Sequence, residues 1–269
     1  MNQKEIVLDV KGLDVQVHSN QGKLQVVQDL SFQIESGKVL GIVGESGCGK
    51  SITCLAILQL LDRVQYVTQG SIRLKELELT NRTEAQLQKI RGKEISLILQ
   101  NPMNAFNPAL TIEKQFLETI YAHSKLSRKQ AHDQAVKSLD EMNLPNPKEL
   151  LKQYPFELSG GMLQRVMIAL SICMKPMLLL ADEPTTALDS VNRHHVVEAL
   201  QIIKKQEKTA ILLVSHDLNV IHELADEVAV MKKGQFVETG SVAQLFSNPK
   251  HEYTKLLLDA RLTTGTRNE

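Results

Sequence analysis

The sequence predicts an α/β protein: a parallel sheet with crossover helices, an antiparallel β-subdomain at the N-terminal end, and an inserted helical subdomain. Two observations lead to this fold class. Short apolar runs typical of buried strands are separated by stretches of helical length, and the runs lie at 38–44, 95–99, 177–181, 210–214 and 227–231. The segment 110–155 differs, because it is rich in helix-forming residues and has no strand candidate. We therefore expect one α/β core divided by a helical insert.

The N-terminal elements follow from alternation and turn signals. β-forming residues alternate at 5–17 and 24–34, and the polar stretch HSNQGK between them indicates a hairpin. After a turn at Ser36-Gly37, the run KVLGIVG is expected to be a buried strand that leads directly into a glycine-rich loop. The stretch ITCLAILQLL, residues 52–61, follows with helical length and no breaker, so a strand, a loop and a helix are predicted in succession.

The composition of the chain argues against nucleic acid as a partner and against a membrane span within the chain. The chain has 269 residues with 31 basic and 31 acidic side chains, so its formal net charge is zero, and it has no basic block of the kind that binds nucleic-acid phosphates. The three cysteines, Cys48, Cys54 and Cys173, follow no paired spacing, which is typical of a reducing cytosol. The start MNQKEIVLDV lacks the apolar stretch of a signal peptide, and no apolar run approaches the roughly 18 residues of a membrane span. We expect partner subunits to hold the chain at any membrane where it works.

The glycine-rich loop GESGCGKS fits the phosphate-binding pattern G-x-x-x-x-G-K-[ST]. Glycines let successive N–H groups turn toward phosphate oxygens, and the following helix adds the positive end of its dipole. In this pattern Lys50 reaches the β- and γ-phosphates and the Ser51 hydroxyl ligates Mg²⁺. A chance match is the alternative, but the predicted strand before the loop and helix after it argue against one. The predicted ATP-binding residues are Gly44, Glu45, Ser46, Gly47, Cys48, Gly49, Lys50, Ser51 and Ile52.

A second chemical signal is the apolar strand MLLLADEP, which ends in two carboxylates. Asp182 is placed to join the Mg²⁺ shell, and Glu183, one residue later, to polarise an attacking water. An ordinary solvated acidic turn before a proline is the alternative. The phosphate-binding loop earlier in the chain favours the catalytic interpretation.

A second glycine pair, in LSGGMLQR at 158–165, opens another predicted helix. It is followed by LLLADEP, by Ala187-Leu188-Asp189 and by LLVSHD with His216, and this order of motifs resembles the ATP-binding cassette (ABC) ATPase family from about residue 5 to 258. The resemblance implies a P-loop NTPase core and two cassettes packed head to tail. Each ATP then lies between the glycine-rich phosphate-binding loop (the P-loop) of one cassette and the LSGG signature of the other. Ser159, Gly160 and Gly161 are therefore expected to act in trans, capping the partner's γ-phosphate.

The resemblance also assigns roles to three further side chains. It implies that Gln100 reaches Mg²⁺ and the attacking water, that Asp189 contacts the opposite cassette, and that His216 contacts the γ-phosphate. The alternatives are an exposed amide, a helix-capping aspartate and an edge histidine. Glu183, His216 and Gln100 form the predicted catalytic set, and Ser51, Gln100 and Asp182 the predicted Mg²⁺ set.

Two positions depart from the pattern of the family. Met162 stands where the signature more often has glutamine. Val17 and His18 stand where many cassettes stack an aromatic ring on adenine, so base stacking is not assigned to them.

The resemblance further implies a single ABC ATPase domain, 1–269, with three parts. The catalytic core with its β-subdomain is expected at 1–100 and 165–240, the helical signature subdomain at 101–164, and a short helical C-terminal tail at 241–269.

The chain resembles the peptide/nickel importer branch in three stretches: QNPMNAFNPALTI, YPFELSGGMLQRVMIAL and NPKHEYTKLLLDA. Within that branch it resembles nickel-importer-type subunits most, because no cysteine cluster follows the last stretch. That branch implies uptake of nickel or a metal chelate, with a second ATPase subunit (a paralogue), two transmembrane permease subunits and an extracellular or periplasmic substrate-binding protein. It also implies a peripheral position on the cytoplasmic face of the inner membrane. Three alternatives stay open: a dipeptide or oligopeptide importer, a soluble ABC ATPase outside transport, and a regulatory cassette that hydrolyses ATP poorly.

Overall fold

The computed structural model describes residues 5–19, 22–186, 188–206 and 208–265. Ala187, named above in one motif, and residues 1–4 and 266–269 of the predicted domain lie outside this part of the chain. The described residues form two compact units, the first within Met1–Thr83 and Ala210–Glu269 and the second within Glu84–Thr209. The predicted subdivision at residues 100, 164 and 240 stays a prediction.

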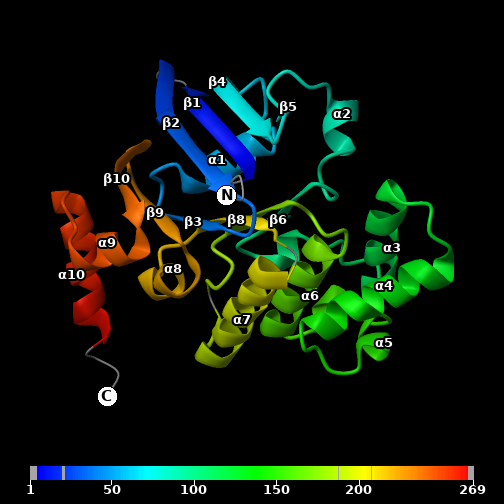
Figure 1. Cartoon of the computed structure of the whole chain (residues 1–269). Coiled ribbons are helices and arrows are strands. Elements are labelled where there is room, and N and C mark those ends of the chain that lie inside the picture. The colour runs from blue at the N-terminus through cyan, green and yellow to red at the C-terminus, as the bar shows by residue number, and fades with distance from the viewer. Residues whose placement is uncertain (1–4, 20–21, 187, 207, 266–269) are drawn as a thin grey trace. The chain divides into compact units, whose positions relative to one another are not determined.

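An antiparallel sheet opens the first unit, with its strands in the order β2-β1-β4-β5 (Figure 1). The predicted hairpin is confirmed, because the first two strands pair antiparallel up to Ser19 and Gly22. The third strand was not predicted, since the polar stretch TQGS interrupts its alternation, and Gly70 within it lies so close to the Gly12 carbonyl that no Cβ would fit. The strands are β1 (Ile6–Ser19), β2 (Gly22–Glu35), β4 (Tyr66–Leu74) and β5 (Leu77–Glu78).

The rest of the first unit carries the buried strands that surround the phosphate-binding loop. The strand before the loop is buried at all five positions and pairs parallel with the two strands beside it. Gly41 on this strand leaves room for Ile221 of a covering helix, whose side chain would lie 2.9 Å from an added Cβ. The strands are β3 (Val39–Val43), β8 (Ala210–Val214), β9 (Glu227–Lys232) and β10 (Gln235–Ser241), and the helices α1 (Lys50–Ile57), α8 (Leu218–Leu224), α9 (Val242–Ser247) and α10 (Glu252–Gly265).

The second unit is mostly helical, as the sequence predicts for 110–155. Two parallel strands, β6 (Ile95–Ile98) and β7 (Leu178–Asp182), pair along their length. Against β6 lies a mostly buried helix, α6 (Gly160–Ile172), which also packs on α4 (Arg128–Glu141). The other elements are α2 (Glu84–Gln88), η1 (Pro102–Asn104), α3 (Ile112–His123), α4 (Arg128–Glu141), α5 (Pro147–Leu150), η2 (Pro155–Glu157) and α7 (Ser190–Gln206).

The predicted fold class is confirmed by this arrangement. All five predicted buried strands are present, while the predicted helix at 52–61 begins at Lys50 and ends earlier, at Ile57. Within the described ranges, no helix combines the length and apolar character that crossing a bilayer requires.

Candidate functional site

The phosphate-binding loop connects the buried end of β3 to the first turn of α1. Gly47 and Gly49 have φ values of 78° and 112°, which side-chain-bearing residues rarely adopt. An added Cβ at Gly49 would lie 2.7 Å from the Val26 carbonyl oxygen, so this position needs glycine for space as well as for conformation. Among the described residues, no oxygen accepts the N–H of Ser46, Gly47 or Gly49. The loop thus offers free donors next to a helix N-terminus, which suits an anion.

Lys50 is folded back onto this loop. Its ammonium group donates hydrogen bonds to the carbonyl oxygens of Gly44, at 2.8 Å, and Glu45, at 2.9 Å, and its side chain is 5% exposed. The positive charge of Lys50 is therefore already positioned at the loop to which phosphates would bind. Burial raises the pKa of the neighbouring Cys48 thiol, an effect that the charge of Lys50 partly offsets, so Cys48 stays a neutral thiol.

Two more predicted residues lie in the first unit. Ser51 is exposed on the first turn of α1. His216 is exposed just beyond the end of β8, next to Asp217, whose carboxylate accepts the N–H of Asn219 at 2.8 Å and caps α8. A capped helix start fixes the backbone on one side of His216, and the buried strand fixes it on the other.

In the second unit, the end of β7 brings three predicted residues together. Asp182 ends the strand, and Glu183 follows it with φ 50°, in the left-handed region. The Glu183 carboxylate accepts hydrogen bonds from Gln100 Nε2, at 3.1 Å, and from Thr186 Oγ1, at 2.9 Å. These contacts fix the direction of the carboxylate, which is what a group that must orient a water needs.

The signature segment opens α6 of the same unit. The Ser159 hydroxyl accepts the N–H of Met162 at 3.3 Å and caps the helix. Gly160 is exposed, and an added Cβ there would meet no atom of the described residues within 4 Å. The helix start therefore has open space in front of it. Met162, the departure noted in the sequence, takes part through its backbone N–H, which any residue could supply.

Asp189 is joined to the signature by a residue that the sequence did not single out. Its carboxylate accepts two hydrogen bonds from Asn192, from the backbone N–H at 2.8 Å and from Nδ2 at 2.6 Å. These bonds lower the pKa of Asp189. The Asn192 carboxamide also fills the space in which a Cβ on Gly161 would lie. Asn192 therefore holds two predicted in-trans residues in one fixed arrangement.

These residues suit ATP and Mg²⁺ chemically. The glycine-rich loop supplies N–H donors and a lysine for phosphate oxygens, and the hydroxyl, amide and carboxylate oxygens of Ser51, Gln100 and Asp182 are the hard ligands that Mg²⁺ prefers. Ser51 belongs to the first unit and the other two to the second.

Comparison with known proteins identifies the family. The family model of ABC transporters matches residues 27–186, which is more than half of the chain. The chain belongs to the ABC transporter family. The predicted resemblance is thereby confirmed, and the LSGG segment, the Asp182–Glu183 pair and the P-loop are motifs of an ABC protein.

Curated relatives of this ABC chain are ATP-binding proteins of import systems. It is 44% identical over 236 residues to the metal-staphylopine import system ATP-binding protein CntD of Staphylococcus aureus, covering 88% of this chain and 87% of that one. It is 40% identical to the oligopeptide transport ATP-binding protein OppD of Bacillus subtilis, covering 98% and 74%. It is also 40% identical to the glutathione import ATP-binding protein GsiA of Escherichia coli, covering 94% of this chain but only 42% of GsiA.

Solved structures support the fold of the ABC chain. The ATP-binding cassette MJ0796, in a dimeric post-hydrolysis state bound to ADP and Pi, matches with a TM-score of 0.78 and 23% identity, over 87% of this chain and 98% of that one. The structure of cbiO1 from Clostridium perfringens matches with a TM-score of 0.75 and 22% identity, over 97% of both chains. At these identities the likeness concerns the fold alone.

Sequence motifs did not find the residues that support the site. Gln164 donates from Nε2 to the carbonyl oxygen of Pro184, at 2.7 Å, and so ties α6 to the turn after Glu183. Thr186 and Asn192, described above, likewise hold site residues in place through side-chain hydrogen bonds. Each acts through a contact that only the folded chain creates, although Gln164 lies within the quoted LSGGMLQR stretch. At the predicted adenine position, Val17 pairs with Tyr66 across the sheet and His18 is exposed.

Proposed function

We propose that this chain is the ATP-binding and ATP-hydrolysing subunit of an ABC importer that takes up nickel or a related metal chelate. The P-loop, the oriented Glu183 and membership of the ABC family support ATP hydrolysis. The 44% identity to CntD over most of both chains supports a metal chelate as the solute. A dipeptide or oligopeptide is the second candidate, because the match to OppD covers nearly all of this chain.

The proposed reaction uses the described residues in defined roles. Lys50 exchanges its carbonyl partners for phosphate oxygens. Ser51, Gln100 and Asp182 would hold Mg²⁺, which would supply positive charge to neutralise the phosphates. The Glu183 carboxylate orients water and accepts its proton, while the Gln100 amide holds that carboxylate in place. His216 contacts the γ-phosphate.

The proposed assembly is a pair of cassettes, with the second one a paralogue. Ser159, Gly160, Gly161 and Asp189 of this chain serve the ATP of that partner. Two permease subunits and an external substrate-binding protein complete the importer, and the chain lies peripherally on the cytoplasmic face of the inner membrane. The exposed Met103, 47% accessible in the NPMNAFNP segment, supports a docking face for a permease.

The observation that carries the catalytic proposal is the hydrogen bond from Gln100 Nε2 to Glu183 Oε2. We expect Glu183→Gln to bind MgATP as the wild type does and to lower turnover at least about 100-fold, because the amide cannot take the proton from water. ATP binding and phosphate release should be measured on the chain co-purified with its partners. Glu198→Gln, on the exposed side of α7, is the matched control and should turn over normally. Wild-type turnover in Glu183→Gln would contradict the role.

Two further measurements separate the candidate functions. Recovery of the chain in membranes with two hydrophobic subunits is expected, and recovery with ribosomes or DNA would favour a soluble ABC ATPase instead. The solute is tested on the cognate external binding protein. Tight binding of Ni²⁺ complexes is expected, and tighter binding of short peptides would favour the oligopeptide alternative.

A further inference from the structure

The C-terminal segment reaches back to the phosphate-binding loop through Tyr253. The Glu45 N–H donates a hydrogen bond to Tyr253 Oη at 3.1 Å, between residues 208 positions apart in the chain. Tyr253 lies near the start of α10 and is only 5% exposed. It belongs to the stretch NPKHEYTKLLLDA, to which the proposed function gives no role. The loop that binds phosphate is thus in direct contact with the tail.

This hydrogen bond fixes the residue that also holds Lys50. The N–H of Glu45 points to Tyr253, and its carbonyl oxygen accepts the Lys50 ammonium group at 2.9 Å. Burial raises the pKa of Tyr253, an effect that the Glu45 N–H partly offsets and the charge of the Glu45 carboxylate increases. The hydroxyl therefore stays protonated and neutral. Glu45 therefore links the Tyr253 hydroxyl to the Lys50 ammonium group through two hydrogen bonds.

Tyr253 is itself held in place by neighbouring parts of the first unit. The Lys232 ammonium group lies 4.6 Å from the centre of the Tyr253 ring. The Glu238 carboxylate accepts the N–H groups of Lys250, at 2.8 Å, and His251, at 3.0 Å, which anchors the chain just before α10. A side chain held at its ring and at its helix start can act as a fixed support rather than a flexible one.

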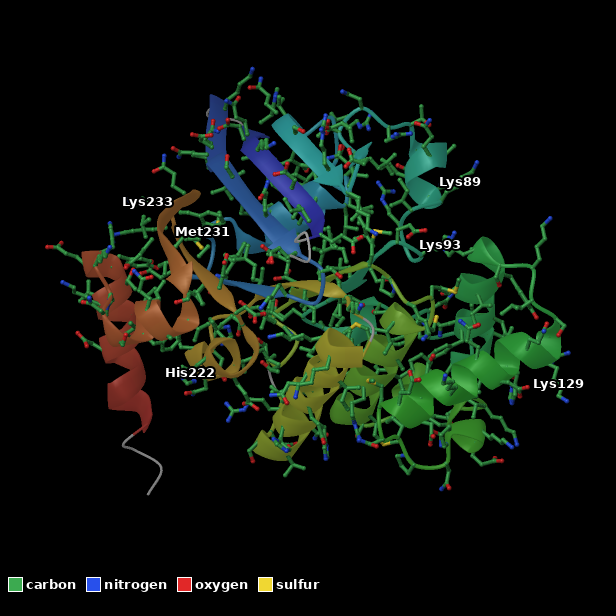
Figure 2. The ribbon with its side chains drawn as sticks, in the orientation of Figure 1. Lys89, Lys93, Lys129, His222, Met231 and Lys233 are labelled. Atoms are coloured by element: carbon green, nitrogen blue, oxygen red, sulfur yellow. The ribbon has the colours of Figure 1, made fainter. Side chains whose placement is uncertain are left out.

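The hairpin of β9 and β10 supports the same loop from another direction. The Gly234 N–H donates to the Cys48 carbonyl oxygen at 2.9 Å. The Met231 carbonyl oxygen lies so close to Gly44 that no Cβ would fit there. Figure 2 labels Met231, which lies in β9, and Lys233, which lies in the turn between the two strands. The loop is therefore held at Gly44, Glu45 and Cys48 by residues from 231 onward.

We propose that Tyr253 is a positioning residue for ATP binding: its hydroxyl holds the Glu45 peptide so that Lys50 and the loop are pre-arranged for the phosphates. This inference rests on the proposed binding of ATP at the P-loop. Binding of the phosphates to a loop that is already ordered carries no further entropy cost for ordering the loop. The hydroxyl therefore favours ATP binding more than turnover.

Tyr253→Phe tests the proposal, because it removes the hydroxyl and keeps the ring that packs beneath Lys232. We expect the Kd for MgATP to rise roughly three- to tenfold, which corresponds to the net free-energy contribution of one hydrogen bond. KM should rise with it, while kcat at saturating ATP and the melting temperature stay close to those of the wild type. Tyr121→Phe, at a 45% exposed tyrosine of α3, is the matched control and should change none of these quantities.

The outcomes distinguish this inference from the proposed function. If the wild type binds MgATP and Tyr253→Phe binds it equally well, the positioning role is overturned and the ATPase proposal stands. A fall in melting temperature together with kcat would show that Tyr253 only stabilises the fold, and it too would overturn the role. A wild-type protein that does not bind MgATP at all would overturn the proposed function and this inference with it.

Discussion

Glu183 adopts a left-handed backbone conformation that costs a residue with a side chain on the order of 1–3 kcal/mol. The sequence predicts its catalytic role from its place after an apolar strand, but not this conformation. Gln100 and Thr186 both hold the carboxylate, and Gln164 holds the next residue, Pro184, through its carbonyl. A conformation that several side chains maintain at a reactive group fits pre-organisation for chemistry. Such support could not be predicted, because it depends on contacts between distant residues.

Gly161 illustrates the same point, and it can be tested by stability. In Gly161→Ala, the new methyl group would occupy the position of the Asn192 carboxamide, which would have to leave Asp189. We expect the free energy of unfolding to fall by about 1–3 kcal/mol, as for other over-packed sites. Urea titration followed by circular dichroism measures this change.

Gly160→Ala is the matched substitution one residue away, where the methyl group would meet no atom within 4 Å in the part of the chain that the structure describes. Its free energy of unfolding should stay the same or rise slightly, because alanine favours helix more than glycine does. Equal stability of the two variants would contradict the tight contact between Gly161 and Asn192.

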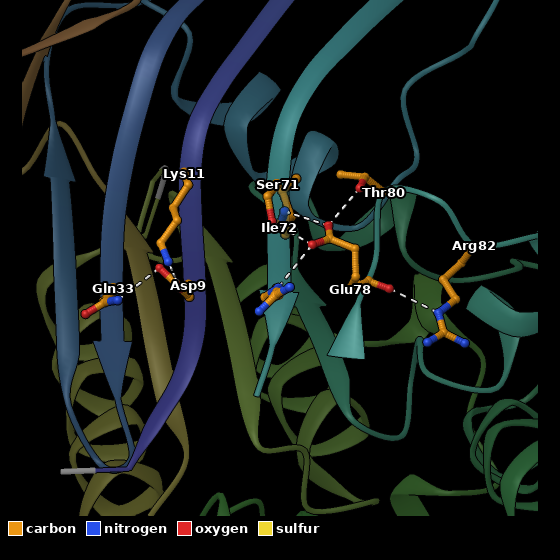
Figure 3. Close-up of polar contacts among 9 residues, drawn as sticks. Asp9, Lys11, Gln33, Ser71, Ile72, Glu78, Thr80 and Arg82 are labelled. Atoms are coloured by element: carbon orange, nitrogen blue, oxygen red, sulfur yellow. Dashed lines mark hydrogen bonds and ion pairs between the residues drawn. The ribbon is translucent and has the colours of Figure 1, made fainter. Parts of the chain in front are cut away.

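Among the elements, the antiparallel sheet was predicted only in part from the sequence. The β1–β2 hairpin was predicted from two alternating segments, whereas β4 and the two-residue β5 were not. The Glu78 carboxylate adds side-chain hydrogen bonds to the backbone pairing of β4 with β5. Glu78 accepts hydrogen bonds from Ser71 Oγ at 2.6 Å, Thr80 Oγ1 at 2.7 Å and the Ile72 N–H at 3.0 Å (Figure 3). Polar contacts of this kind have no periodic signature in a sequence.

The Glu78 carboxylate makes the stability of this sheet depend on pH. Partial burial would raise the pKa of Glu78, but hydrogen bonds from Ser71, Thr80, the Ile72 N–H and Arg73 outweigh it and lower the pKa from 4.5 to about 2. A carboxyl whose pKa is lower in the folded state stabilises the fold above its unfolded pKa. That stabilisation is present at neutral pH and is lost as the pH falls from about 4.5 toward about 2.

We therefore expect Glu78→Gln to lower the free energy of unfolding at pH 7 by about 1–2 kcal/mol, a value reduced for the partial exposure of the group. The difference from wild type should shrink as urea titrations are repeated from pH 5 down to pH 3. Glu76→Gln, at an exposed carboxylate two residues earlier, should show no such trend. A difference that stays constant with pH would mean that the charge of Glu78 contributes nothing.

For the whole molecule, the order of motifs predicted the family, which the family model confirms. The roles of the site residues, and a nucleotide shared by two chains, stay predictions. The structure places Lys50, Ser51 and His216 in one compact unit, and Gln100, Glu183 and the signature in the other. No sequence pattern predicts the contact of Tyr253 with the loop around Glu45, because contacts between residues so far apart in the chain leave no local pattern. Motifs thus predict which residues react, and long-range contacts determine how these residues are held.

Ser159→Arg tests whether the site is shared between two chains. The substitution puts a bulky cation at the open start of α6, where Gly160 is exposed. In the assembled importer, we expect nucleotide trapping at the P-loop of the variant chain to continue, while trapping at the partner's P-loop falls at least about tenfold, the scale of losing an aligned anion contact. Site-resolved labelling with a photoreactive ATP analogue measures both, and Ser247→Arg on α9 is the control for an added surface arginine. Loss at the variant chain's own P-loop alone would mean that each chain completes its own nucleotide site, because an arginine at Ser159 can block only the nucleotide that this serine faces.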